Sequence, residues 1–193
     1  MTLLALIRHA PTEWSAAGRL QGRADPPLDP ATLPEWRLPK ALAGFRVIAS
    51  PLCRAVETAR LLGTAAPAIE PRLVEMAWGA WEGQTLAELR ARLGPAMAAA
   101  EAAGLDFRPP GGESPRDVQR RLVPLLAELA EAGGATAAIT HKGVIRAMFA
   151  LAAGWDMCGK PPDRLSWSGA HLFRLGAGGA PVVERLNLPL ECP

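Results

Sequence analysis

The chain has 193 residues, of which 49% are hydrophobic and 21% charged, and its formal net charge is +2. This length suits one domain with its own core, and the composition is ordinary for a globular protein. So small a net charge gives no reason to expect a nucleic-acid or membrane partner, so any affinity for anions must come from a few placed arginines.

The cysteines and histidines argue against two kinds of structural site. Cys53, Cys158 and Cys192 are odd in number and widely spaced, which argues against a disulfide framework and fits a reducing compartment. The three histidines show no metal-type spacing, so we expect no structural zinc. The apolar start, residues 1–7, is too short for a signal-peptide core or a membrane span. We therefore expect a cytoplasmic protein.

Short apolar runs alternate with segments of helical periodicity along most of the chain. The expected strands cover residues 3–7, 46–50, 136–140, 170–175 and 181–186, and the expected helices cover 53–62, 114–132 and 143–152. Runs that are apolar at every position are typical of strands covered on both faces. The last two strands flank a Gly-rich turn and predict a hairpin. The order predicts a three-layer α/β/α sandwich with a mainly parallel mixed sheet.

Residues 84–112 break this alternation. They contain two short Ala-rich segments of helical character and end in a stretch rich in Pro and Gly. We predict a single domain over residues 1–193, in which 84–112 form a helical lid over the active face.

Charged residues follow three of the predicted strands. Arg8 and His9 follow the first strand, Arg54 lies shortly after the second, and His141 follows the third. In a parallel α/β sheet, ligands bind beyond the carboxyl ends of the strands, so these side chains are expected at one edge. Taken singly, each has an ordinary explanation, such as a surface arginine for Arg54 or a strand-end cap for His141.

This set of side chains suits the chemistry of a phosphate group. Guanidinium groups offer paired donors to a phosphate dianion, and a neutral histidine is a competent nucleophile. A second histidine, if protonated, adds charge in the transition state. A leaving alkoxide needs a proton, for which Glu75 is the first candidate and Glu82 the second. We interpret His171, inside a late strand, as structural.

Six segments in a fixed order connect the chain to a known family. They are Arg8-His9-Ala10 with Thr12 to Ser15, Gly18 to Gly22, Ser50 to Ala55 with Glu57-Thr58-Ala59, Leu73-Val74-Glu75 with Trp78 to Gly83, Gly111 to Ser114, and Thr140-His141-Lys142-Gly143 with Arg146. In this pattern the chain, from Leu4 to about Leu186, resembles the histidine phosphatase superfamily, which includes the phosphoglycerate mutases. Ala10, Ser15 and Lys142 stand where that family commonly has Gly, Asn and Gly.

The resemblance implies a mechanism and a site. His9 would be transiently phosphorylated, Arg8, Arg54 and His141 would hold the phosphate, and Glu75 would donate and later recover a proton. Further substrate or phosphate contacts are expected from Ser15, Gln21, Gly22 and Lys142. No metal and no cofactor is implied, because arginines neutralise the charge.

The expected function is hydrolysis of a small phosphorylated metabolite, with no nucleic-acid or membrane partner and with a monomer or homodimer left open. One alternative is a cofactor-dependent phosphoglycerate mutase, which must keep its phosphohistidine away from water. The short, open lid and the lack of long insertions favour hydrolysis. A second alternative is an inactive binding or regulatory protein of the same fold, against which the retained His9, Arg8, Arg54 and His141 argue.

Overall fold

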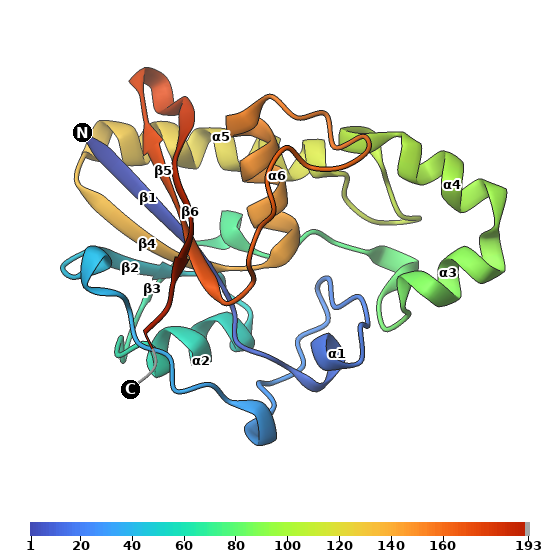
Figure 1. Cartoon of the computed structure of the whole chain (residues 1–193), viewed down its shortest axis with the longest axis horizontal. Helices are drawn as coiled ribbons and strands as arrows, with labels where there is room; N and C mark the ends of the chain where they lie inside the picture. Colours follow the sequence, from blue (N-terminus) through green and yellow to red (C-terminus); the bar gives the residue numbers. More distant parts are fainter. Residues whose placement is uncertain (192–193) are drawn as a thin grey trace.

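The computed structural model describes residues 1–191 and shows one six-stranded sheet with helices on both faces (Figure 1). The strands are β1 (Thr2–Arg8), β2 (Arg46–Ala49), β3 (Ala68–Ile69), β4 (Ala135–Thr140), β5 (Gly169–Leu175) and β6 (Pro181–Pro189). The helices are α1 (Glu13–Ala16), α2 (Cys53–Leu61), α3 (Leu86–Leu93), α4 (Pro95–Ala102), α5 (Pro115–Ala132) and α6 (Lys142–Ala153).

The sheet confirms the predicted fold class. Its strand order is β3-β2-β4-β1-β5-β6. The first four strands run parallel, and β5 and β6 form the antiparallel pair predicted from the Gly-rich turn. Strands β1 and β4 are neighbours, with Arg8 opposite Thr140. The carboxyl ends of β1 and β4 therefore lie together, and the residues that follow them share one edge of the sheet.

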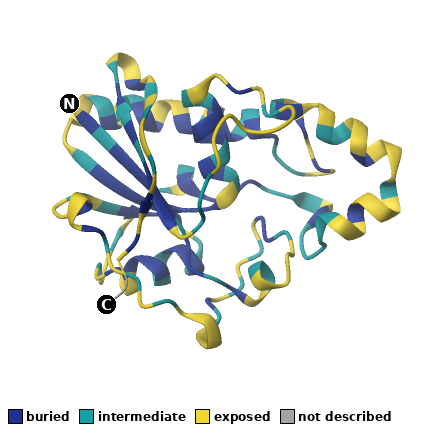
Figure 2. Cartoon of the chain, in the orientation of Figure 1, coloured by how far each residue is buried: buried dark blue, intermediate teal, exposed yellow. Residues whose placement is uncertain are grey.

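Both faces of the sheet are covered, which explains why residues 3–7 of β1 are apolar at every position. Leu4 and Leu6 of β1 pack in a core cluster with residues of α5 and α6. Ala5 and Ile7, which point to the other face, pack in a second cluster with residues of α2. In Figure 2 the central strands are almost entirely buried.

Helix α5 begins and ends as its sequence predicts. The Ser114 hydroxyl accepts a hydrogen bond from the Asp117 amide, and the Asp117 carboxylate accepts one from the Ser114 amide, forming a capping box. Pro115 occupies the first helical position, where a missing N–H has no consequence. Gly133 ends the helix with a φ of 70°, a conformation that glycine adopts without a steric penalty.

Two small elements were not predicted. Strand β3 has two residues at the edge of the sheet, and helix α1 has four residues. Neither is long enough to show a hydrophobic period. Between α1 and β2 the helical backbone is limited to 3-10 turns at Pro30–Thr32 and Lys40–Leu42.

The two helices predicted within residues 84–112 are present as α3 and α4. They project from the body of the molecule and are largely exposed (Figures 1 and 2). Only Leu89 of α3 and Met97 of α4 are buried. Beyond α4 the chain returns to the core at Phe107, whose ring lies 5.6 Å from that of Trp78. The action of this segment as a lid stays a prediction.

Cys53 and Cys158 are free thiols, whereas Cys192 lies outside the described residues. Within residues 1–191, no helix is long and apolar enough to cross a membrane.

Candidate active site

A cavity of about 560 Å³ opens at the carboxyl edge of the sheet, beyond the ends of β1 and β4. Among the residues that line it are Arg8, His9, Ser15, Gln21, Glu75, Lys142 and Gly143, together with Leu86, Arg90, Glu101 and Phe107 of the predicted lid segment. The cavity therefore brings Arg8 and His9 together with Glu75 and with the helical segment 84–112, whereas Arg54 and His141 are not among its lining residues.

His9 lies in the wall of this cavity with a defined tautomer. Its Nδ1 is 2.7 Å from the carbonyl oxygen of Ala10. Because a carbonyl oxygen only accepts, Nδ1 must carry the proton, which leaves Nε2 with a free lone pair. Burial, followed by the charges of Arg8 and Arg54, lowers the pKa of His9 to about 3. The imidazole is therefore neutral at physiological pH, as a nucleophile must be.

Arg8 follows the last core residue of β1 and reaches the same cavity. Its guanidinium carbon lies 5.9 Å from the centre of the Trp167 ring. Its Nε is buried and has no hydrogen-bond partner among residues 1–191. Burial is the main cause that lowers the pKa of Arg8, followed by the opposing effects of Glu75 and Arg54. An unpaired, partly desolvated guanidinium at this position is suited to an anionic ligand.

Arg54 is fully buried in the first turn of α2 and is not among the residues that line the cavity. Its Nη1 donates to the carbonyl oxygen of Ala24 at 2.7 Å and to the Asp25 carboxylate at 3.3 Å, and its Nη2 donates to the Gly22 carbonyl at 2.9 Å. Its Nε has no partner among the described residues. The guanidinium thus holds the loop at 22–25 while one edge stays unpaired.

His141 ends the run of β4 and is the N-cap residue of α6. It is fully buried, and its ring centre lies 5.2 Å from that of His9. Its Nε2 is 2.7 Å from the Ser50 hydroxyl oxygen, and its Nδ1 is buried without a partner within residues 1–191. Burial, then the charges of His9 and Arg54, lowers the pKa of His141 well below its usual value.

Glu75 brings a carboxyl group to the same cavity. One of its oxygens accepts from the Met76 amide at 2.7 Å and the other from the Gly143 amide at 3.2 Å. It forms no ion pair within residues 1–191, and burial raises its pKa. Position 143 needs glycine for this approach, because a Cβ there would lie 2.5 Å from a Glu75 oxygen. The arrangement favours a carboxyl group that carries a proton more readily than an exposed glutamate does.

Glu82, the second candidate for the acid, has a different position. Its carboxylate accepts hydrogen bonds from the backbone amides of Arg23, Ala24 and Trp78. It does not belong to the cavity wall. Glu82 therefore holds the loop whose carbonyl groups bind Arg54, a role that only the hydrogen-bond pattern shows.

The four residues expected to make further substrate contacts differ in whether their polar groups already form hydrogen bonds within the protein. The Ser15 hydroxyl donates to the Thr12 carbonyl at 2.9 Å within the cap of α1. The Gln21 carbonyl oxygen accepts from the Thr12 hydroxyl at 3.0 Å, and its residue lines the cavity. Gly22 takes a φ of 54° and offers its carbonyl to Arg54. The Lys142 Nζ lies 5.2 Å from the centre of the Trp167 ring. Their contacts to phosphate stay predictions.

Sequence reasoning missed the segment between α6 and β5. Residues 154–168 have no regular secondary structure, and Met157 and Gly159 of this segment line the cavity. Trp167 lies beside Arg8 and Lys142. Arg146, quoted above only as part of a motif, also lines the cavity. The segment has no hydrophobic period, and its tryptophans were its only sequence signal.

A family model for the histidine phosphatase superfamily, branch 1, matches residues 4–187 of the chain. This is nearly the range over which the sequence motifs were recognised.

Curated relatives with several activities share this similarity. A bifunctional protein of Mycobacterium tuberculosis is 38% identical over 132 residues, which cover 63% of this chain and 35% of that protein. The alignments thus span about a third of the length of the first curated relatives. A 2,3-bisphosphoglycerate-dependent phosphoglycerate mutase of Methylobacterium radiotolerans is 31% identical, covering 96% of this chain and 90% of the mutase. A glucosyl-3-phosphoglycerate phosphatase of Mycobacterium tuberculosis is 31% identical, covering 81% and 79%.

Solved structures share the fold over nearly the whole chain. YhfR of Bacillus stearothermophilus superposes with a TM-score of 0.82 at 27% identity, covering 99% of this chain and 98% of YhfR. A mycobacterial glucosyl-3-phosphoglycerate phosphatase in complex with VO3 superposes with a TM-score of 0.74 at 26% identity, covering 96% and 98%.

Proposed function

The chain belongs to the histidine phosphatase superfamily, and on that basis we propose that it hydrolyses the phosphomonoester of a small metabolite, with His9 as nucleophile. The observation that carries this proposal is the state of His9. Its Nδ1–H is fixed on the Ala10 carbonyl, so a neutral Nε2 is available in the cavity that also contains Glu75. A nucleophile and an acid in one cavity meet the first requirement of phosphoryl transfer through a covalent intermediate.

In the first step, the Nε2 lone pair of His9 attacks phosphorus and the ester P–O bond breaks. Glu75 gives its proton to the departing alkoxide oxygen, so the products are an alcohol, a phosphohistidine and the Glu75 carboxylate. The raised pKa of Glu75, caused by burial, supports this role because the acid must enter the step protonated.

In the second step, a water molecule attacks the phosphohistidine. The Glu75 carboxylate takes a proton from that water while the new P–O bond forms and the P–N bond to His9 breaks. Inorganic phosphate leaves, and both His9 and Glu75 return to their starting protonation states. One carboxyl group serves both steps because it acts as acid in one and as base in the other.

Three cationic or donor groups would hold the phosphoryl oxygens. Arg8 and Arg54 each have an unpaired Nε–H facing a buried region, and His141 has an unpaired Nδ1 among the described residues. Burial and nearby positive charge lower the pKa of His141, and a phosphate dianion beside it would raise that pKa again. Substrate binding would thus favour the protonated form that stabilises the transition state. This arrangement supports a reaction that needs no metal ion.

A phosphoglycerate mutase is the second candidate, because one relative with that name aligns with 96% of the chain. The two functions differ in the fate of the phosphohistidine. A mutase returns the phosphoryl group to the isomeric hydroxyl, whereas a phosphatase transfers it to water. Incubation with 3-phosphoglycerate separates them, since a mutase yields 2-phosphoglycerate and a phosphatase yields inorganic phosphate.

The test of the proposed function is phosphate release over a panel of several dozen phosphorylated metabolites. We expect turnover of at least one ester, and acid-labile, base-stable label on the protein after a rapid quench with a ³²P-ester. His9→Ala should lose both, with turnover reduced on the order of 10⁴-fold or more.

His171→Gln is the matched control, because His171 is also buried but bonds to the backbone outside the cavity. It should keep the label. Turnover by His9→Ala at near wild-type rates would show that another residue is the nucleophile. No turnover and no label with any ester would favour a binding protein of the same fold.

A further inference from the structure

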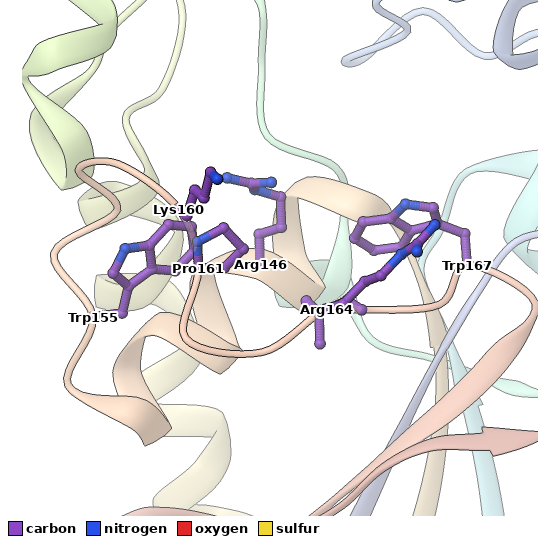
Figure 3. A pocket seen from close by; sticks show the side chains of 7 residues that line it. Arg146, Trp155, Lys160, Pro161, Arg164 and Trp167 are labelled. Atoms are coloured by element: carbon purple, nitrogen blue, oxygen red, sulfur yellow. The ribbon is translucent and has the colours of Figure 1, made fainter.

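A second cavity, of about 400 Å³, lies next to the catalytic one and is formed mostly by residues 154–168 (Figure 3). Among the residues that line it are Arg146, Trp155, Lys160, Pro161, Arg164 and Trp167. In Figure 3 the two indole rings stand at opposite sides of the cavity, and the side chains of Arg146 and Lys160 are seen between them. The cavity therefore has two aromatic walls and three cationic side chains.

The positive charge of this cavity is not compensated. Arg146, Lys160 and Arg164 form no ion pair with any carboxylate within residues 1–191. The acidic neighbours in the segment are Asp156, which accepts from the Cys158 amide, and Asp163, which is exposed. Cations gathered in a hollow repel one another unless an anion joins them, so the cavity is arranged to bind negative charge.

The second cavity adjoins the catalytic cavity at one shared residue, Arg146. Arg146 lines both of them, and its guanidinium carbon lies 5.3 Å from the centre of the Trp155 ring. Trp167, a wall of the second cavity, is contacted by Arg8 and Lys142 from the catalytic side. A molecule with a phosphoryl group at His9 can therefore extend past Arg146 toward Lys160 and Arg164.

We propose that the second cavity binds a second anionic group, a carboxylate or a phosphate, carried by the same substrate molecule. The indole of Trp167, which lies between the two cavities, contacts the part of the substrate between the two charges. This inference rests on the proposed phosphatase function and narrows its substrates to phosphomonoesters with an additional acidic group. The exposed Lys160 and Arg164 select the substrate, whereas the buried groups around His9 carry out the reaction.

The test uses aryl phosphates that differ only in a remote charge. One series carries a carboxylate on one, two or three methylenes at the 4-position of phenyl phosphate, and the matched neutral series carries a methyl group in its place. For the wild type we expect kcat/KM of the best-fitting anionic ester to exceed that of its neutral partner by about tenfold or more. This preference should shrink as salt is added, because Lys160 and Arg164 are exposed and salt screens their charges.

The double variant Lys160→Gln/Arg164→Gln should reduce the preference by about fivefold or more. Arg185→Gln, which removes an exposed arginine of β6 that lines neither cavity, should keep it. Equal kcat/KM for the anionic and neutral esters of every length would overturn the inference and leave the phosphatase function intact. A preference that survives in the double variant would also overturn it, because the second charge would then bind elsewhere.

Calorimetry on His9→Ala, which binds ester without turning it over, separates failure of the inference from failure of the function. Even if the wild type hydrolyses no ester, the subsite is supported when the anionic ester binds more tightly than the neutral ester and this difference depends on Lys160 and Arg164. Equal affinity for the two esters rejects the subsite. Added succinate should inhibit with the anionic ester only. Stimulation of the neutral ester by succinate would show a separate effector site instead.

Discussion

Arg54 at the sheet edge and the cationic groups on the segment after α6 are held in different ways. At the sheet edge, Arg54 is fully buried and its Nη atoms donate to two backbone carbonyls and a carboxylate. After α6, Lys160 and Arg164 are exposed and make no ion pair within residues 1–191. Backbone acceptors fix a guanidinium in one orientation, whereas exposed cations remain free to adapt.

This difference matches two different tasks. Stabilising charge that develops in a transition state requires donors that are already oriented, since reorientation would consume part of the gain. Recognising the rest of a substrate tolerates adaptable side chains, each of which contributes less. We therefore expect substitutions at the sheet edge to have large effects on every ester and substitutions on exposed segments to have small or ester-specific ones.

The strongest test of this comparison is Arg54→Ala. We expect kcat/KM to fall by about 10²- to 10⁴-fold for all esters, because a donor to the transferred phosphoryl group is lost. Stability should fall as well, since the Gly22 and Ala24 carbonyls lose their partner, at a cost of about 1–3 kcal/mol for each group left unsatisfied. Steady-state kinetics and thermal melting measure the two effects.

Arg54→Lys separates charge from geometry at this position. An ammonium keeps the charge but cannot donate to both carbonyls and to phosphate as a planar fork does. It should recover little of the lost rate. Recovery to within about threefold of the wild type would show that charge alone suffices, and the contrast between fixed and adaptable cations would lose its basis.

The sequence predicted the groups at the sheet edge because each follows a recognisable element. Arg8 and His9 come at the end of the apolar run of β1, and His141 directly follows β4, so the pairing of the two strands brings them together. It could not predict the acceptors of Arg54 or the role of Glu82, because these depend on the path of the loop at 22–25. Hydrogen bonds between segments that are distant in the chain leave no periodic signal.

The cavity wall after α6 escaped sequence reasoning for a related reason. Residues 154–168 have neither hydrophobic alternation nor helical spacing, so nothing indicated on which side of the sheet edge they lie. Arg146 was visible in a motif, but its position above Trp155 depends on how the segment folds back. Strand β3 was missed because two residues are too few for a pattern.

A second prediction concerns Glu75, whose pKa is raised by burial, as suits a carboxyl group that donates a proton. Glu75→Gln should slow alkyl phosphates by about 10²- to 10⁴-fold, because an alkoxide leaves poorly without a proton. For 4-nitrophenyl phosphate, whose phenolate leaves readily, kcat/KM should fall by less than about tenfold, because kcat/KM reports the steps up to phenolate release and not the later hydrolysis in which Glu75 is the base. The measurement is kcat/KM for both esters in the wild type and in the variant, and the two fold-changes are then compared.

The pH profile gives an independent reading of the same residue. Activity of the wild type with an alkyl ester should fall as pH rises through the pKa of Glu75, since only the protonated carboxyl donates. The neutral form of His9 is present throughout that range, because its pKa is lowered to about 3. In Glu75→Gln this descending limb should be absent. Equal slowing of both esters, with the limb retained, would assign the acid to another group.

The smallest effect is expected for Arg116→Gln, which breaks an exposed ion pair. Arg116 of α5 donates to Asp106 at 2.6 and 2.9 Å, and Asp106 lies just after α4. Like Arg54–Asp25, this is an arginine–aspartate pair, but water competes for both of its partners. The melting temperature should change by at most about 2 °C, and kcat/KM for neutral esters should stay within about twofold. A fall in kcat/KM close to that of Arg54→Ala would contradict the comparison. An exposed arginine would then matter as much to the reaction as a buried one.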